Sequence, residues 1–170
     1  MELFGEPLED LVFSVLSSRV VEKYDKKFFD VLTAYSFEKS NLKINEHFFP
    51  WMHVSSVLDS FARHPRTVDL VLLDDAVSNY DDSEALLGFC DAVLFFSGLL
   101  PEAFGKRIVS VGYYQKLARQ GFRTLHMRTT RDSYFNMMSN YFDRYSGALS
   151  FMRKNLLPES FLREEELLIQ

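Results

Sequence analysis

Apolar residues recur at every third or fourth position along most of the chain, and this spacing limits the fold more than any other feature. Residues with that period lie on one side of an α-helix, whereas a half-buried strand alternates at every second position. Glycine and proline, which interrupt helices, number only 7 and 5 among 170 residues. The sequence therefore predicts an all-α protein, folded as a single-domain bundle of roughly six or seven helices over residues 1–170.

Several residue types mark where these helices begin. Pro7 suits a first helical position, and Ser110 is expected to cap a later helix. Capping boxes are expected at Asp81–Glu84 and at Thr129–Asp132. Residues 40–46 alternate polar and apolar side chains and fit either a short strand or a loop. The predicted helices span about 7–18, 21–38, 50–63, 67–78, 81–96, 110–125 and 131–157, followed by a short helix or docking tail over 158–170.

Three features of these segments bear on packing. The segment 81–96 is apolar on nearly every side, so we expect it to be the central buried helix. Gly121 lies inside a predicted helix, where glycine costs about 1 kcal/mol relative to alanine, and this indicates a close contact with another helix. Cys90, the single cysteine, lies in an apolar run and is expected to be buried rather than reactive.

The last predicted helix, 131–157, carries two apolar stripes. The first runs from Tyr134 to Met152 in steps of three and four. The second advances in steps of seven and comprises Phe135, Phe142, Leu149 and Leu156. Together they form a face wider than one helix pair needs, which indicates a homodimer. The 17 phenylalanines fit an aromatic core, an apolar cavity between helices, or an aromatic patch at a dimer interface.

Charge is divided sharply along the sequence. Residues 67–105 contain eight acidic side chains and no lysine or arginine, whereas residues 106–131 contain seven basic side chains and no acidic one. The two blocks either form a partner-binding surface or face each other inside the fold. The net charge of −5 argues against nucleic acid as a partner.

One helical face within the basic block is a candidate site for an anion, a phosphorylated ligand or an acidic partner. Its members recur at helical spacing, with His126 in line: Tyr113, Lys116, Arg119 and Arg123. The alternative interpretation is the solvated back of a helix.

Familiar catalytic and metal-binding patterns are not found in the sequence. The four histidines lack metal-ligand spacing and are interpreted as isolated surface or partly buried side chains: His47, His53, His64 and His126. The pairs Asp74–Asp75 and Asp81–Asp82 are interpreted as a solvated helix end and an N-cap rather than a magnesium site. No phosphate-binding glycine loop or Gly-x-Ser-x-Gly elbow occurs. We therefore expect no metal, no cofactor and no catalytic residue.

One segment resembles a known family. It reads Phe96-Ser97-Gly98-Leu99-Leu100-Pro101-Glu102, then Arg107, then Ser110-Val111-Gly112-Tyr113-Tyr114. It is similar to a segment of uncharacterised bacterial helical proteins that carry Phe-x-Gly-x-x-Pro-Glu, Arg and Ser-x-x-Tyr-Tyr in this order. The resemblance covers about twenty residues and implies a bacterial, cytoplasmic, helical protein without an established activity. In this segment we expect Glu102 and Arg107 to hold a turn together by a charge-assisted hydrogen bond.

These observations favour a helical protein-interaction or regulatory module that acts by binding, without catalysis, as a homodimer. The alternative is a small-molecule-binding protein or enzyme, with an aromatic pocket of several hundred Å3 and Arg119 or Arg123 at its mouth. The first residues lack a signal-peptide pattern, and the longest apolar stretch, near 93–100, is shorter than the ~20 residues of a membrane span. We therefore expect a soluble cytoplasmic protein that has no membrane partner.

Overall fold

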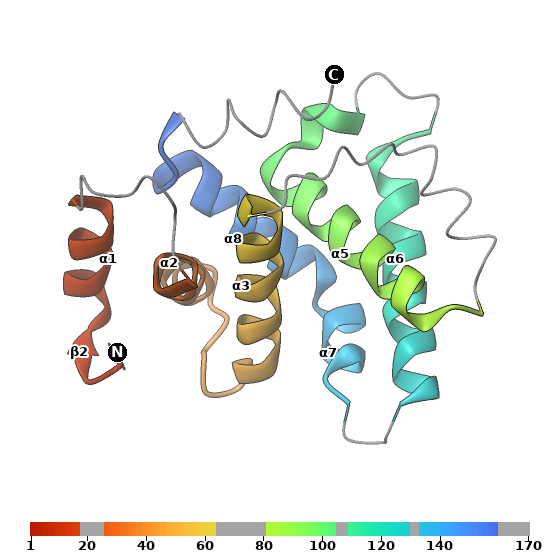
Figure 1. Cartoon of the computed structure of the whole chain (residues 1–170), viewed down its shortest axis with the longest axis horizontal. Helices are drawn as coiled ribbons and strands as arrows, with labels where there is room; N and C mark the ends of the chain where they lie inside the picture. The colour runs from red at the N-terminus through yellow and green to blue at the C-terminus, as the bar shows by residue number, and fades with distance from the viewer. Residues whose placement is uncertain (18–25, 64–80, 105–108, 130–132, 160–170) are drawn as a thin grey trace.

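The computed structural model describes residues 1–17, 26–63, 81–104, 109–129 and 133–159 (Figure 1). Within these ranges the fold is all-α, as the apolar spacing predicts, apart from one small N-terminal hairpin. The elements are β1 (Glu2–Leu3), β2 (Glu6–Pro7), α1 (Leu8–Ser17), α2 (Lys26–Lys39), α3 (Phe48–Arg63), α5 (Ser83–Leu99), the 3-10 helix η1 (Pro101–Phe104), α6 (Val111–Arg128), α7 (Phe135–Asn140) and α8 (Phe142–Asn155). None of the helices described in these ranges has the length and hydropathy that a membrane crossing requires.

The hairpin replaces the predicted helix start at Pro7. Strands β1 and β2 pair antiparallel, and the two residues between them, Phe4 and Gly5, both have positive φ angles, of 55° and 81°. This backbone matches the tight turn that joins two twisted strands. Helix α1 therefore begins one residue later, at Leu8.

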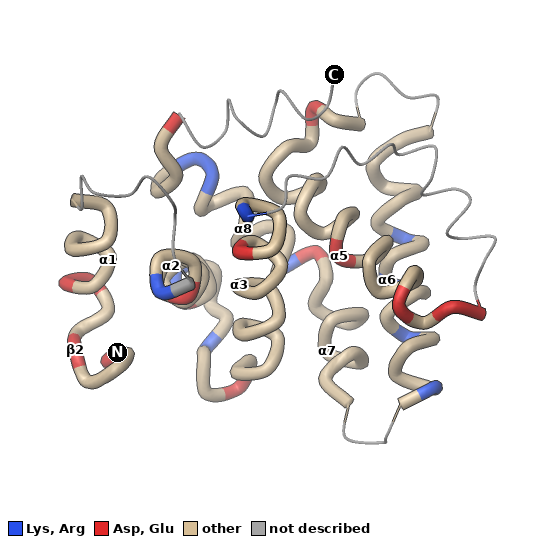
Figure 2. The backbone as a smooth tube through the Cα atoms, in the orientation of Figure 1, with Lys and Arg blue, Asp and Glu red and all other residues tan. Residues whose placement is uncertain are grey.

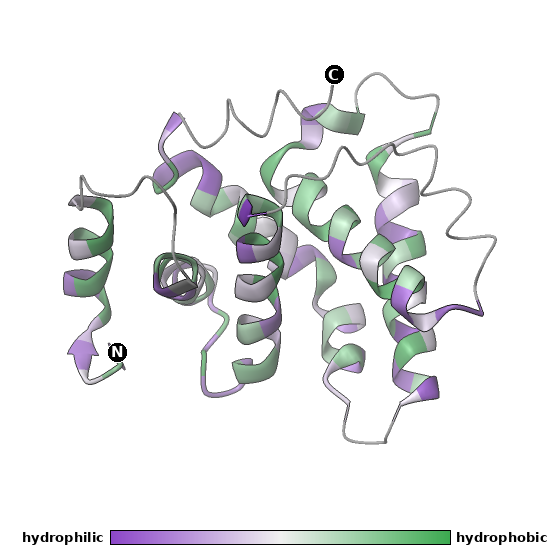
Figure 3. Cartoon of the chain, in the orientation of Figure 1, coloured by the Kyte–Doolittle hydropathy of each residue, from purple (hydrophilic) through white to green (hydrophobic). Residues whose placement is uncertain are grey.

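Helix α5 lies at the centre of the bundle, as its apolar sequence predicts. It packs against α6 on one side and α8 on the other, while α2 packs against α1, α3 and α8. Colouring by hydropathy shows apolar residues along the turns of α5 (Figure 3). The Trp51 indole on α3 donates a 2.9 Å hydrogen bond to the Asp30 carbonyl on α2, and the Ser55 hydroxyl donates to the Asp30 carboxylate. These polar contacts fix the position of α3 against α2.

Two glycines allow α5 to approach its neighbours. A Cβ added at Gly121 on α6 would collide with the Cys90 sulfur, so the expected close contact at this glycine is confirmed. A Cβ at Gly98 would lie 2.5 Å from the Leu149 Cβ on α8. The helix predicted over 81–96 therefore extends past Gly98 and continues to Leu99.

The helix predicted over 131–157 is divided into two. Tyr141 separates α7 from α8 with backbone angles of −106° and 13°. The division allows α7 to pack along α6 while α8 packs against α5 and α2. Phe142 and Leu149 are 0% and 1% exposed, so the middle of the apolar face that indicated a homodimer is covered within the chain, whereas Tyr141 is 36% exposed.

Several predicted boundaries move by a few residues. Asp82, not Asp81, caps α5, and its carboxylate accepts hydrogen bonds from the amides of Glu84 and Ala85. Ser110 does precede α6, but its side chain makes no capping hydrogen bond. Thr129 follows the end of α6 rather than opening a helix, and residues 40–46 form turns, which confirms the loop interpretation. The helix predicted over 67–78, the Asp74–Asp75 pair and residues 160–170 of the predicted tail lie outside the described residues.

Candidate functional site

The predicted basic face lies on α6, where Lys and Arg positions follow the helix (Figure 2). Lys116 and Arg123 are exposed, and Tyr113 is 49% exposed. Arg119 differs, because its guanidinium forms an ion pair with Asp143 on α8 while its Nε atom is buried without a hydrogen-bond partner. One of the four candidates therefore joins two helices, and the other three remain open to a ligand.

An acidic residue of the 67–105 block pairs with a basic residue that lies outside the 106–131 block. The Glu102 carboxylate forms a two-pronged pair with Arg153 on α8, at 2.7 and 2.9 Å. This pair lowers the pKa of Glu102, chiefly through the hydrogen bond that Arg153 donates. The contact expected with Arg107 is not described, since that residue lies outside the described ranges, and Arg153 holds η1 against α8 instead.

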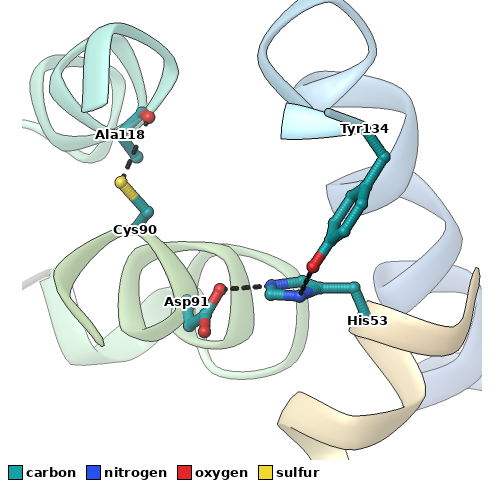
Figure 4. Close-up of polar contacts among 5 residues, drawn as sticks. All are labelled: His53, Cys90, Asp91, Ala118 and Tyr134. Carbon is teal, nitrogen blue, oxygen red and sulfur yellow. Dashed lines mark hydrogen bonds and ion pairs between the residues drawn. The ribbon is translucent and has the colours of Figure 1, made fainter. Parts of the chain in front are cut away.

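His53 on α3 lies at the centre of a hydrogen-bonded group that joins three parts of the chain (Figure 4). Its Nε2 atom is 2.6 Å from a carboxylate oxygen of Asp91 on α5, and its Nδ1 atom is 2.9 Å from the hydroxyl of Tyr134, just before α7. The His53 and Asp91 side chains are only 10% and 19% exposed. A carboxylate only accepts hydrogen bonds, so Nε2–H donates to Asp91, and in the neutral ring Nδ1 accepts from Tyr134.

The environment keeps the Tyr134 phenol protonated. Burial raises its pKa, and the nearby Asp91 charge raises it further. The phenol is therefore a hydrogen-bond donor at neutral pH, which suits its contact with His53 Nδ1. Both ring nitrogens of His53 are engaged by protein groups, and this arrangement holds the imidazole in place rather than presenting it to a substrate.

Cys90 is adjacent to Asp91 in sequence but faces the opposite direction (Figure 4). Its thiol lies 3.4 Å from the Ala118 carbonyl on α6, and the residue is fully buried. Burial raises the pKa of this thiol well above its ordinary value, and the Asp91 charge adds to the effect. Cys90 is thus an inert core residue, as expected, and does not pair with His53.

His47 forms a second histidine–tyrosine contact, at the turn before α3. Its Nδ1 atom is 2.8 Å from the hydroxyl of Tyr145 on α8. Burial lowers the pKa of His47, and the positive charge of Arg144 lowers it further, against a smaller opposing effect of Glu46. His47 and His53 are therefore buried or partly buried side chains, each hydrogen-bonded to a tyrosine. Their tyrosine partners lie 98 and 81 positions away, so no local spacing indicates them.

A pocket opens between α3 and α5. It has a volume of about 80 Å3 and is lined by Val57, Ser60, Phe61, Gly88 and Asp91. This pocket is smaller than the several hundred Å3 that the sequence analysis proposed. Its charged group is an aspartate, and neither Arg119 nor Arg123 lines it.

An aromatic surface lies at the end of the bundle where α3 begins. We call it the end patch and define it as Phe48, Phe49, Met52, Tyr134 and Tyr141. Phe49 is 62% exposed and stacks on Tyr134 with ring centres 6.2 Å apart. The His47 ring contacts Tyr141 at 4.9 Å and so connects the α7–α8 junction to the start of α3. The sequence gives no sign of this surface, because its members come from three separate segments.

Within the described residues, no three or more histidine, cysteine, aspartate or glutamate side chains gather in a way that would hold a metal ion. Comparison of the chain with known protein families, with curated proteins and with solved structures finds no match.

Proposed function

We propose that this protein acts by binding rather than by catalysis, and that its binding surface is the end patch, which pairs with a second copy of the chain. The observation that carries the proposal is the cluster of exposed apolar side chains at one end of α3. Phe48, Phe49 and Met52 are 45%, 62% and 40% exposed, although each is large enough to belong in a core. Clustered exposed aromatics of this kind are typical of interface centres.

The patch is held in shape before any partner arrives. Phe49 stacks on Tyr134, whose hydroxyl is fixed by His53, and His53 is fixed in turn by Asp91. A surface that is already ordered loses less conformational entropy on binding. This supports a role for the His53 group as the support of a binding surface.

Charges beside the patch favour a second copy as the partner. Lys43 and Glu46 lie in the turn before α3 and form an ion pair with each other at 3.8 Å, with side chains 70% and 61% exposed. A two-fold interface brings a surface against itself, so a patch flanked by one positive and one negative side chain is self-complementary. In such a dimer the Lys43–Glu46 pair of one copy can exchange partners with the same pair of the other.

Sedimentation equilibrium of the purified protein tests the proposal. We expect a concentration-dependent mass that approaches twice the chain mass. Phe49→Lys places a charge at the centre of the interface and should shift the protein to monomer, since an unpaired buried charge disfavours association strongly. Phe13→Lys is the matched control, because Phe13 is 75% exposed on α1, away from the patch, and should leave the dimer intact.

A wild-type protein that stays monomeric at about 100 µM, a concentration at which even micromolar dimers are mostly formed, would contradict the proposal. Equal disruption by Phe13→Lys would do the same. We also propose that the chain belongs to the family that its 96–114 segment resembles. We propose a location in the cytoplasm as well.

A further inference from the structure

The pocket between α3 and α5 combines one buried charge with apolar walls. Asp91 supplies the charge, and its side chain is 19% exposed. Val57 and Phe61 of α3 form the apolar wall, while Ser60 and Gly88, both exposed, lie at the rim. This pocket lies two to three turns along α3 from the end patch, so it is a separate surface from the proposed dimer interface.

The geometry of Asp91 leaves it able to hold a cation. His53 takes one carboxylate oxygen, Oδ1, at 2.6 Å, and this bond orients the group. A carboxylate can accept about four hydrogen bonds, so the acid keeps acceptor capacity on the side that lines the pocket. A positively charged donor would form a charge-assisted hydrogen bond there, about twice as strong as a neutral one.

The walls select the shape of the ligand. The Phe61 ring stacks on Phe95 with centres 4.2 Å apart, so this wall is rigid. The Ser60 hydroxyl at the rim offers a further acceptor. Space of about 80 Å3 exceeds what a single water needs but falls below the range of drug-sized ligand sites.

From this arrangement we infer that the α3–α5 pocket is a binding site for a primary alkylammonium group, with the ammonium on Asp91 and the short carbon stem against Val57 and Phe61. The group belongs either to a free small amine or to the lysine side chain of a partner. Anions are disfavoured by Asp91, and a purely apolar ligand would leave its carboxylate without a donor.

Titration with n-butylammonium, followed by amide NMR shifts in phosphate buffer, tests the inference. Tris is avoided because it is itself a primary amine. We expect saturable shifts at Ser60, Gly88 and Asp91, and none with n-butanol, which has the same stem without the positive charge, or with butyrate, which carries a negative charge. Asp91→Asn, which keeps the shape of the side chain, should weaken binding at least about tenfold, because it removes the charge from the hydrogen bond.

Gly88 provides a second variant that blocks the pocket without disturbing the core. A Cβ added at Gly88 meets no atom within 4 Å, and the same holds at Gly147 on α8. Gly88→Leu should therefore fill the pocket and abolish the shifts, whereas Gly147→Leu, an equal change on another exposed helix face, should preserve them. Both variants should fold, since leucine favours a helix more than glycine does.

Three results would overturn the inference: no saturable shift with n-butylammonium, equal binding of n-butanol, or unchanged binding in Gly88→Leu. A parallel titration with a capped lysine tripeptide separates the two sources of the ammonium group. Shifts with the peptide identify a lysine from a partner as able to enter, and shifts with the free amine alone identify a small amine. Neither result depends on the oligomeric state, so failure of the dimer proposal leaves this test intact.

Discussion

The imidazole of His53 and the carboxylate of Asp91 join α3 to α5 through a 2.6 Å hydrogen bond between side chains that are mostly buried. Helices α3 and α5 make few other contacts compared with the packing of α5 on α6 and α8. This polar bond and the stacking of Phe61 on Phe95 together fix the position of α3 against α5.

Replacement of Asp91 should reveal how much this bond stabilises the fold. Asp91→Ala leaves His53 Nε2–H partly buried without an acceptor, and we expect the free energy of unfolding to fall by about 1–3 kcal/mol. Urea unfolding followed by the fluorescence of Trp51, the single tryptophan, measures the change. Asp59→Ala is the control, because the Asp59–Arg63 pair is more exposed and should contribute no more than about 0.5 kcal/mol. Equal losses in the two variants would show that the His53 bond adds nothing.

His47 should make stability depend on pH in mildly acidic solution. Its pKa is lowered in the folded state from the ordinary value of 6.5, so the unfolded chain binds the proton more readily. The stabilisation from neutral His47 is therefore complete above pH 6.5 and is lost as the pH falls through the folded-state pKa. Urea midpoints across this window should fall less steeply for His47→Asn than for the wild type, since the other histidines contribute equally to both. Parallel pH profiles would contradict this assignment.

The three glycines at 88, 121 and 147 should respond differently to alanine. At Gly121 the new methyl group collides with the Cys90 sulfur, and we expect a loss of about 1–3 kcal/mol in unfolding free energy. At Gly88 and Gly147 the methyl group enters open space, and the better helix propensity should stabilise the protein by about 0.5–1 kcal/mol. Thermal unfolding of the three variants measures both signs. Cys90→Ala should restore part of the stability of Gly121→Ala, and no restoration would place the strain elsewhere.

The Cys90 thiol should be unreactive in the folded protein. It is fully buried and its pKa is raised by burial, so a thiol reagent such as DTNB can react only when the structure opens. Reaction should be slow in buffer and rapid in denaturing urea. A Gly147→Cys variant supplies an exposed thiol as an internal reference, which should react at once while Cys90 does not. Rapid reaction of wild-type protein would show that α5 and α6 separate readily.

Local sequence patterns predict the helices because periodicity, caps and glycine positions act within a few residues. Such patterns predict the close contact at Gly121, the burial of Cys90 and the central place of α5. The division at Tyr141 is not, because the apolar stripe continues through it and only packing against three different helices favours the break.

The sequence does not predict the candidate site, for a related reason. His53, Asp91 and Tyr134 come from three segments, and each residue type is ordinary in its own surroundings. Only the crossing of α3 and α5 near the start of α7 brings them together. The predicted basic residues Lys116, Arg119 and Arg123 share a helical face, as their spacing requires, but the His53 group and the pocket lie on other helices.

The contacts of His53 reach across 38 and 81 positions of the sequence, which has a consequence for the order of folding events. Closing long loops costs chain entropy before any contact rewards it, so such bonds form after the nearby helix pairs α2–α3 and α5–α6. A weakened His53 group should accordingly speed unfolding and leave the refolding rate almost unchanged. Stopped-flow measurements on Asp91→Ala would show the opposite pattern if this junction belonged to the folding nucleus. Because its bonds form late, the group that orders the end patch is expected to be among the last parts of the molecule to assemble and the first to come apart.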